Sequence, residues 1–146
     1  MKNGKIDRSL LYLYCMIELF SKGDTRNFIK TVLPTEIASF DNGTVHEVYS
    51  TFALARDAEW SGRLFVLEMK EEGEEGIGTQ ITVIHKSPAF VGQEITFISS
   101  FVEITERNEI ITSYQAFCGE RLIAEGIQGQ KILKIEKIEK LFETLR

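Results

Sequence analysis

The sequence predicts an α+β fold in which a curved antiparallel sheet wraps around one long helix, and two features of the chain predict it. Between Phe52 and Met69, apolar side chains lie around most of the helical circumference, as in a helix that other structure covers on several sides. Between Ile77 and Lys131, apolar and polar residues alternate through four segments that short turns separate. A strand is also expected before the helix, so the chain order is strand, helix, then antiparallel strands.

The size and charge of the chain limit the classes of protein to which it can belong. Its 146 residues suit one domain with one core. Its formal net charge of -5, from 17 basic and 22 acidic side chains, leaves no excess of cations to bind nucleic acid. We therefore expect one domain over residues 1–146, with an N-terminal extension over 1–25, a C-terminal helix over 134–146 and no nucleic-acid partner.

An apolar run near the N-terminus, residues 10–17, follows two lysines, Lys2 and Lys5. The run is much shorter than the roughly 20 residues that a membrane span needs. Glu18 interrupts its continuation, and no small-residue cleavage site follows it. We therefore expect a packed extension, helical over 9–20 or irregular, and neither a signal peptide nor a membrane anchor.

The two cysteines, Cys15 and Cys118, predict a reducing environment. They lack the spacing of a metal site, and each lies in an apolar run where a buried free thiol is common. We therefore expect no metal ion at these residues and a cytoplasmic location.

The segment before the long helix predicts a bent strand and a turn. Residues 27–33 are rich in β-branched and aromatic side chains, and residues 36–40 continue the pattern after Pro34. A strand that bends or breaks near Pro34 is the simplest interpretation. Asp41-Asn42-Gly43 is a strong turn signal, and His46 follows it in a loop or at a strand edge.

The long helix should begin at Ser50 or Thr51, because both carry the hydroxyl that an N-cap residue uses. Gly62 is the one poor helix former inside it. The glutamate-rich residues 68–76 predict its frayed end and a solvated acidic turn.

The second half of the chain predicts strands and a final helix. Two-residue turns at 107–108 and 119–120 predict antiparallel hairpins. The strands are expected over 77–86, 94–106, 109–118 and 121–131. Apolar residues at helical spacing predict an amphipathic C-terminal helix, namely Ile135, Ile138, Leu141, Phe142 and Leu145. A sheet whose strands curl around one apolar helix is the hotdog fold, whereas a helix on an open flat sheet, the alternative, would be polar along one face.

Few side chains in this arrangement could carry chemistry. His85 ends an apolar strand, where a histidine is more often a hydrogen-bonded structural residue, and His46 has no chemical signal near it. Glu59 lies in an apolar helix, where a carboxylate costs desolvation free energy unless it is paired or functional. Thr51 suits an N-cap, and it lies about 12 Å from Glu59 along a straight helix axis, so the two cannot touch.

Together these residues form a pattern that resembles the fluoroacetyl-CoA thioesterase family of hotdog proteins. In that family a Thr precedes a Glu by eight residues on the central helix, a Gly-Thr pair opens the next strand, and a His ends it. The similarity covers about residues 44–131, and the combined spacing is much more specific than any one residue. The matching residues are Thr51, Glu59, Trp60, Gly78, Thr79, His85, Pro88 and Gly92.

The resemblance implies an acyl-CoA thioesterase for a small or medium acyl group. It implies a catalytic set and a group of substrate-binding residues, namely Thr51, Glu59 and His85 for the first, and Gly78, Thr79 and Trp60 for the second. No metal or redox cofactor is expected, and coenzyme A enters as part of the substrate. His85 is the natural general base, Glu59 can orient it or attack directly, and Thr51 can attack or position the carbonyl, so the nucleophile stays open.

The resemblance also implies a homodimer or higher homo-oligomer with the site at the subunit interface, where a Thr51 and His85 pair could be completed across two chains. The segment up to about Asn27 matches no part of the family's fluorine-selecting lid, so selectivity for fluoroacetyl-CoA is not expected. Two other functions stay open: a non-catalytic acyl-CoA-binding or regulatory module, and a hydratase or dehydratase that acts on an enoyl-CoA.

Overall fold

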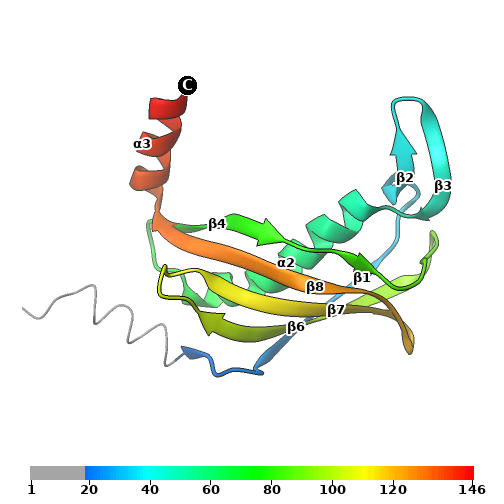
Figure 1. The fold of residues 1–146 in the computed structure, drawn as a ribbon, viewed down its shortest axis with the longest axis horizontal. Coiled ribbons are helices and arrows are strands. Elements are labelled where there is room, and N and C mark those ends of the chain that lie inside the picture. The colour runs from blue at the N-terminus through cyan, green and yellow to red at the C-terminus, as the bar shows by residue number, and fades with distance from the viewer. Residues whose placement is uncertain (1–18) are drawn as a thin grey trace, which may run out of the picture.

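The computed structural model of the protein describes residues 19–146 and shows a curled antiparallel sheet with one long helix packed against it (Figure 1). The expected helix over 9–20 lies almost wholly outside the described residues. The elements, in chain order, are β1 (Thr25–Thr31), the 3-10 helix η1 (Pro34–Glu36), β2 (Ile37–Phe40), β3 (Gly43–Tyr49), α2 (Thr51–Met69), β4 (Glu74–Ile81), β5 (Ile84–His85), β6 (Glu94–Ile104), β7 (Ile110–Cys118), β8 (Arg121–Lys134) and α3 (Ile135–Leu145).

The main sheet has six strands in the order β1-β6-β7-β8-β4, with β5 paired to β8, and every pairing is antiparallel. α2 contacts β1, β4, β6, β7 and β8, so the sheet curls around one side of the helix. This arrangement confirms the hotdog fold. β2 and β3 form a separate hairpin that projects past β4 (Figure 1).

The break expected near Pro34 is the 3-10 turn η1, and it moves the chain from one sheet to the other. β1 pairs with β6 in the main sheet, whereas β2 pairs only with β3. The expected turn joins β2 to β3, with Gly43 at a φ of 109°, which an L side chain rarely adopts. The hairpin then leads directly into α2.

The strand expected over 77–86 is divided into β4 and β5. Between them Thr82 crosses over β8: its backbone N–H donates to the Ile127 carbonyl at 2.9 Å, and the Ile127 N–H donates to its hydroxyl at 2.9 Å. Gly126 permits the crossing, because a Cβ there would lie 2.0 Å from the Thr82 carbonyl oxygen. β4 also starts earlier than expected, inside the acidic segment, where Glu75 pairs with Arg63 and Lys70.

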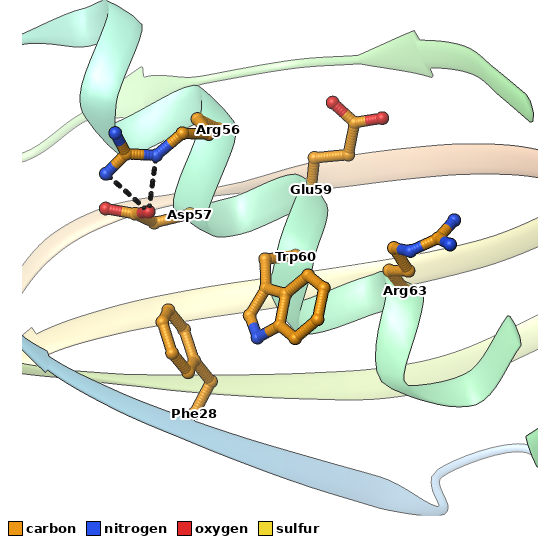
Figure 2. Close-up of a pocket in the computed structure, with 6 residues that line it drawn as sticks. All are labelled: Phe28, Arg56, Asp57, Glu59, Trp60 and Arg63. Atoms are coloured by element: carbon orange, nitrogen blue, oxygen red, sulfur yellow. Dashed lines mark hydrogen bonds and ion pairs between the residues drawn. The ribbon is translucent and has the colours of Figure 1, made fainter. Parts of the chain in front are cut away.

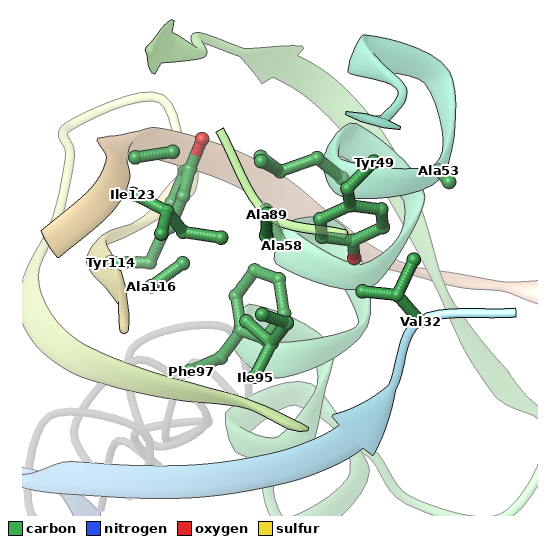
Figure 3. Packing of buried hydrophobic residues seen from close by; sticks show 12 residues of the cluster. Val32, Tyr49, Ala53, Ala58, Ala89, Ile95, Phe97, Tyr114, Ala116 and Ile123 are labelled. Atoms are coloured by element: carbon green, nitrogen blue, oxygen red, sulfur yellow. The ribbon is translucent and has the colours of Figure 1, made fainter. Parts of the chain in front are cut away.

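Two clusters of buried apolar side chains lie between α2 and the sheet. The larger one, drawn in Figure 3, surrounds the first half of the helix and consists of Val32, Tyr49, Ala53, Leu54, Ala58, Ala89, Ile95, Phe97, Tyr114, Ala116, Ile123 and Ala124. The smaller one surrounds its second half and consists of Phe20, Phe65, Val66, Met69, Phe101 and Ile110. Burial of apolar area in these clusters provides the main stabilising free energy of the fold.

The side of α2 that faces away from the sheet keeps several large apolar side chains exposed. Phe52 is 61% exposed, Trp60 42% and Leu67 39%. The sequence predicted apolar side chains around most of this helix. The sheet of the same chain covers those on one side of α2, and those on the other side are exposed. Large exposed apolar patches mark binding surfaces for ligands or partners.

Cys118 is a half-buried free thiol packed against the larger cluster, and Cys15 lies outside the described residues. Within residues 19–146, no helix combines the length and the apolar character that crossing a membrane would require. No group of three or more His, Cys, Asp or Glu side chains in this range is arranged to hold a metal ion.

Candidate active site

Thr51 and His85 meet within one chain. The Thr51 Oγ1 and His85 Nε2 atoms are 3.0 Å apart, a hydrogen bond between residues 34 positions apart. Ser50 is the N-cap of α2, and its hydroxyl accepts from the Ala53 N–H at 3.2 Å. Because Ser50 caps the helix, the Thr51 hydroxyl is left for His85, and the alternative of Thr51 as a plain N-cap is removed.

The backbone around His85 is held by β8. His85 pairs with Ala124, and the Lys86 N–H donates to the Ile123 carbonyl at 2.8 Å. The imidazole itself is exposed. A short rigid strand therefore presents a solvent-accessible ring to the first residue of α2, which is a suitable geometry for moving a proton.

Glu59 lies two turns further along α2 and faces Gly78 of β4. A Cβ on Gly78 would lie 2.8 Å from Glu59 Oε1, so the absence of a side chain there makes room for the carboxylate. The Gln128 side chain donates to the Glu59 carbonyl at 3.3 Å and fixes this turn of the helix over the sheet. Gly62 accommodates Gln128, because a Cβ at that position would overlap the Gln128 side chain.

The structure therefore brings the expected catalytic residues together in two groups. Thr51 contacts His85, and Glu59 lies against Gly78. In the part of the chain that the structure describes, no hydrogen bond joins the Glu59 carboxylate to Thr51 or His85, and all three side chains are exposed. Both groups are therefore accessible to solvent or to another molecule.

Thr79 is the extra residue of a β-bulge. Gly78 pairs with Gln130 and Gln80 with Gly129, so Thr79 has no partner of its own on β8. Its hydroxyl donates to the Glu109 carboxylate, and this bond, together with one from Gln80, lowers the pKa of Glu109. The Thr79 side chain does not share the Glu59 side of β4: its hydroxyl and the Gln80 side chain both bond Glu109 and lie against Gly129, whereas the Cα of Gly78 faces Glu59.

Trp60 borders a hollow on the open side of α2 (Figure 2). The hollow has a volume of about 390 Å³, and its walls are two aromatic rings and four charged side chains: Phe28, Arg56, Asp57, Glu59, Trp60 and Arg63. All but Phe28, which comes from β1, belong to one face of α2. The hollow adjoins the Glu59 half of the site and combines flat apolar surface with cations.

A charge cluster with buried carboxylates adjoins the hollow and was not predicted from the sequence. Lys30 and Arg56 both bind the carboxylates of Glu36 and Asp57, at 2.9 Å for each contact with Asp57, and the Tyr49 hydroxyl donates to Asp57 at 2.5 Å. These ion pairs and the hydrogen bond connect β1, η1 and the end of β3 to the second turn of α2. The one sequence signal was the adjacent Arg56-Asp57 pair in a largely apolar part of the helix.

Burial and hydrogen bonding shift the pKa values of Glu36 and Tyr49 in this cluster, in opposite directions at Glu36 and in the same direction at Tyr49. Burial by itself raises the pKa of Glu36, but hydrogen bonds from Lys30, the Leu33 N–H and Arg56 outweigh it and hold the pKa at about 2. Burial, and then the bond to Asp57, raise the pKa of Tyr49 above its ordinary value. Glu36 is therefore charged, and Tyr49 neutral, throughout the neutral range.

Acid is expected to destabilise the protein through Glu36. Its folded-state pKa of about 2 lies below the ordinary 4.5, so its contribution is complete above about pH 4.5 and is lost as the pH falls toward 2. The free energy of unfolding in urea, measured at several pH values, should fall less steeply over this window in Glu36→Gln than in the wild type. Exposed Glu120→Gln is the matched control, and equal slopes for wild type and Glu36→Gln would contradict the role of Glu36.

Solved structures with the same fold are hotdog proteins. A Thermus thermophilus hypothetical protein, a thioesterase superfamily member, is 31% identical, with 86% of this chain and 92% of that chain covered and a TM-score of 0.81. A hot-dog-like protein from Thermanaerovibrio acidaminovorans is 22% identical, with coverages of 88% and 96% and a TM-score of 0.79. A mutant of the fluoroacetyl-CoA-specific thioesterase FlK, in complex with fluoroacetate and CoA, is 21% identical, with coverages of 82% and 99% and a TM-score of 0.75.

The fold and these similarities define a hotdog protein of the thioesterase superfamily. No curated protein matches the chain. The sequence model of the fluoroacetyl-CoA-specific thioesterase family matches residues 32–136, and the chain belongs to that family. The resemblance read from the spacing of Thr51, Glu59 and His85 is thereby confirmed at the level of the family, while the roles of these three residues stay predictions.

Proposed function

We propose that the protein hydrolyses the thioester of a small or medium acyl-CoA to the free acid and CoA, with Thr51, Glu59 and His85 as its catalytic residues. The observation that carries this proposal is the 3.0 Å contact between Thr51 Oγ1 and His85 Nε2 at the open start of α2. A hydroxyl paired with an imidazole is the arrangement by which a weak nucleophile loses its proton. Membership of the thioesterase family supports the same reaction class.

The chemistry follows from these groups. His85 accepts a proton from the attacking hydroxyl, either that of Thr51 or that of a water beside it, as a new C–O bond forms at the thioester carbon. The N–H groups of Thr51 and Phe52 precede the first intrahelical bond, which Leu54 donates to Ser50 at 3.0 Å, and they can donate to the developing oxyanion. The C–S bond then breaks, and the proton on His85 passes to the thiolate of CoA. If water is the nucleophile, this step yields the free acid. If Thr51 is the nucleophile, the acyl group stays on its Oγ1 as an ester; a water then attacks the ester carbon with His85 as base, the bond between that carbon and Oγ1 breaks, and the proton on His85 returns to Thr51 as the acid leaves.

Glu59, two helical turns from Thr51 on α2, forms the second part of the proposed site. Its carboxylate lies against Gly78, where a strand without a side chain lets a thin pantetheine arm pass. Trp60 and the hollow beside it offer a flat apolar surface next to Arg56 and Arg63. In this arrangement Thr79 contacts substrate through its backbone, since its hydroxyl is bonded to Glu109.

We further propose that the active form is a homodimer in which the β4 strands of two chains pair. β4 is the last strand of the sheet, and its outer edge has no strand beside it within residues 19–146. Exposed strand edges bind other strands unless they are blocked. Ile81, the last residue of β4, is 38% exposed and would be covered in the dimer.

A thiol-release assay on a series of acyl-CoAs of increasing chain length tests the proposal. We expect release of free CoA with a preference for short or medium chains, and no release from any chain length would contradict it.

The separation of Glu59 from His85 also fits a protein that binds acyl-CoA without turnover. Calorimetric binding with recovery of intact ligand would support that second function, and activity on an enoyl-CoA alone would indicate a hydratase.

Alanine at Gly78 is expected to lower kcat/KM without unfolding the protein. The new Cβ would displace the Glu59 carboxylate, from which it would lie 2.8 Å, and a misplaced catalytic group can cost about 10²-fold in rate. The measurement is thiol release by Gly78→Ala, by Glu59→Gln and by the double variant. If both changes act on the same carboxylate, their effects will not add, whereas wild-type activity in Gly78→Ala would show that Glu59 is not needed in this position.

A further inference from the structure

Within residues 19–146, the C-terminal helix α3 has an apolar face that the rest of the chain leaves largely exposed. It has no buried residue, and its apolar side chains repeat at helical spacing along one face. Leu141 is 48% exposed, Phe142 50% and Leu145 77%. In Figure 1, α3 stands away from the sheet on the β4 side. An amphipathic helix gains most of its stability from the packing of its apolar face, so we expect another apolar surface to cover this face.

α3 begins beside the start of β4. The Ile135 N–H donates to the Gly73 carbonyl at 2.9 Å, immediately before β4, and Lys134 pairs with Glu74. These bonds fix the base of α3 at one end of the open sheet edge.

The β2-β3 hairpin lies at the opposite end of the same edge. It leads into Thr51, which binds His85 four residues beyond the last residue of β4. The hairpin carries its own exposed apolar surface: Phe40 is 57% exposed and packs edge-to-face on Phe52 with 5.3 Å between ring centroids, and Val45 is 51% exposed. Figure 1 shows α3 and the hairpin projecting past β4 on the same side, at its two ends.

A two-fold axis beside the middle of β4, midway between the strand and its copy, would bring these two projections of different chains together. When a strand pairs antiparallel with its own copy, the start of one strand lies opposite the end of the other. The base of α3 in one chain would then face the β2-β3 hairpin of the second chain. At the opposite end of the paired strands, α3 of the second chain would face the hairpin of the first. The apolar face of each helix would meet the exposed rings of the other chain.

We infer that α3 packs its apolar face on the β2-β3 hairpin and first helical turn of a second copy of this chain, so that each active site is covered by the C-terminal helix of the partner subunit. The inference rests on the proposed dimer and deepens it. Phe52 directly follows Thr51, so the covering helix would form an apolar wall beside the thioester carbonyl and exclude bulk water there. It would also limit the space for the acyl chain.

The charges of α3 favour this occupant over a lipid surface. Helices that lie on membranes are rich in Lys and Arg on their polar face. The polar face of α3 instead interleaves three glutamates with two lysines, namely Glu136, Glu139 and Glu143 with Lys137 and Lys140. A helix without cationic excess has no attraction for anionic lipid, whereas an apolar stripe is sufficient to bind exposed aromatic rings.

Cross-linking between chains tests the inference. In a background with Cys15 and Cys118 changed to serine, two differently tagged chains are co-expressed, one with Leu141→Cys and the other with Val45→Cys, and treated with a short bismaleimide. The matched control replaces Leu141→Cys by Glu143→Cys, on the opposite face of α3. We expect about tenfold more cross-linked heterodimer with Leu141→Cys than with the control, because the polar face turns away from the contact.

Each other outcome overturns the inference. Equal yields, no cross-linked heterodimer, or a cross-link only when both cysteines are on one chain would exclude the contact. Co-sedimentation of the wild type with phosphatidylglycerol vesicles that Phe142→Asp abolishes would assign the face to lipid. The assay is independent of catalysis: thiol release without the cross-link would refute the helix contact alone, and the cross-link without thiol release would refute the proposed activity alone.

Discussion

Replacing His85 with alanine is expected to lower kcat/KM for acyl-CoA hydrolysis by about 10² to 10⁴-fold, the range over which general-base catalysis contributes. Among the described residues, the His85 imidazole is the only side-chain group that hydrogen-bonds to the Thr51 hydroxyl. Without it, neither Thr51 nor a water beside it has a base to take its proton. Thiol release at saturating and subsaturating acyl-CoA separates kcat from KM.

The other histidine of the chain provides the control for this prediction. His46 is exposed on β3, in the hairpin, and within the described residues no hydrogen bond joins its imidazole to Thr51 or His85. His46→Ala should keep wild-type kcat, and Thr51→Ala should resemble His85→Ala if the hydroxyl is the nucleophile. Wild-type kcat in His85→Ala would remove His85 from the mechanism.

Replacing Phe65 with alanine is expected to lower the free energy of unfolding by about 3–5 kcal/mol, as is common for large aromatic side chains removed from cores. Phe65 has no exposed surface, and its ring contacts Phe20 and Phe101 with centroids 5.0 Å and 6.0 Å away. The loss would leave a cavity between α2, the start of β1 and β6. Since most domains are stable by only about 5–15 kcal/mol, much of the protein would unfold on mild heating.

Urea unfolding followed by circular dichroism measures this effect. Phe65→Leu fills more of the cavity and should lose less stability than Phe65→Ala. Leu67→Ala, on the exposed side of the same helix, controls for the change in helix propensity and should change the unfolding free energy much less. Equal losses in Phe65→Ala and Leu67→Ala would show that the smaller cluster is not a core.

The elements that the sequence predicted well are those with a strong local signal. The span of α2, the Asp41-Asn42-Gly43 turn and the three final strands agree with the structure to within a few residues, because periodicity and turn chemistry act over short distances. The expected strand over 77–86 was wrong as a single unit, since its break at Thr82 depends on Gly126, a residue far away in the chain. The helix over 9–20 stays a prediction.

The candidate site was predicted only as a pattern. Its residue types and spacing led to the family, but the distances between side chains needed the fold. The charge cluster around Glu36 and Asp57 was missed, because Lys30 and Glu36 lie on separate elements and show no common spacing with Arg56. Ion pairs between distant segments leave no periodic signal in a sequence.

The sequence by itself determined the helical and strand periods, the hotdog order of elements and the family, because each depends on neighbours in the chain. Only the tertiary structure decided that Ser50 caps α2 while Thr51 binds His85, that Gly78 makes room for Glu59, and that residues 19–146 leave the apolar face of α3 exposed at one end of β4. The physical reason is that side chains 34 residues apart meet through sheet register and helix packing, which are properties of the whole folded chain.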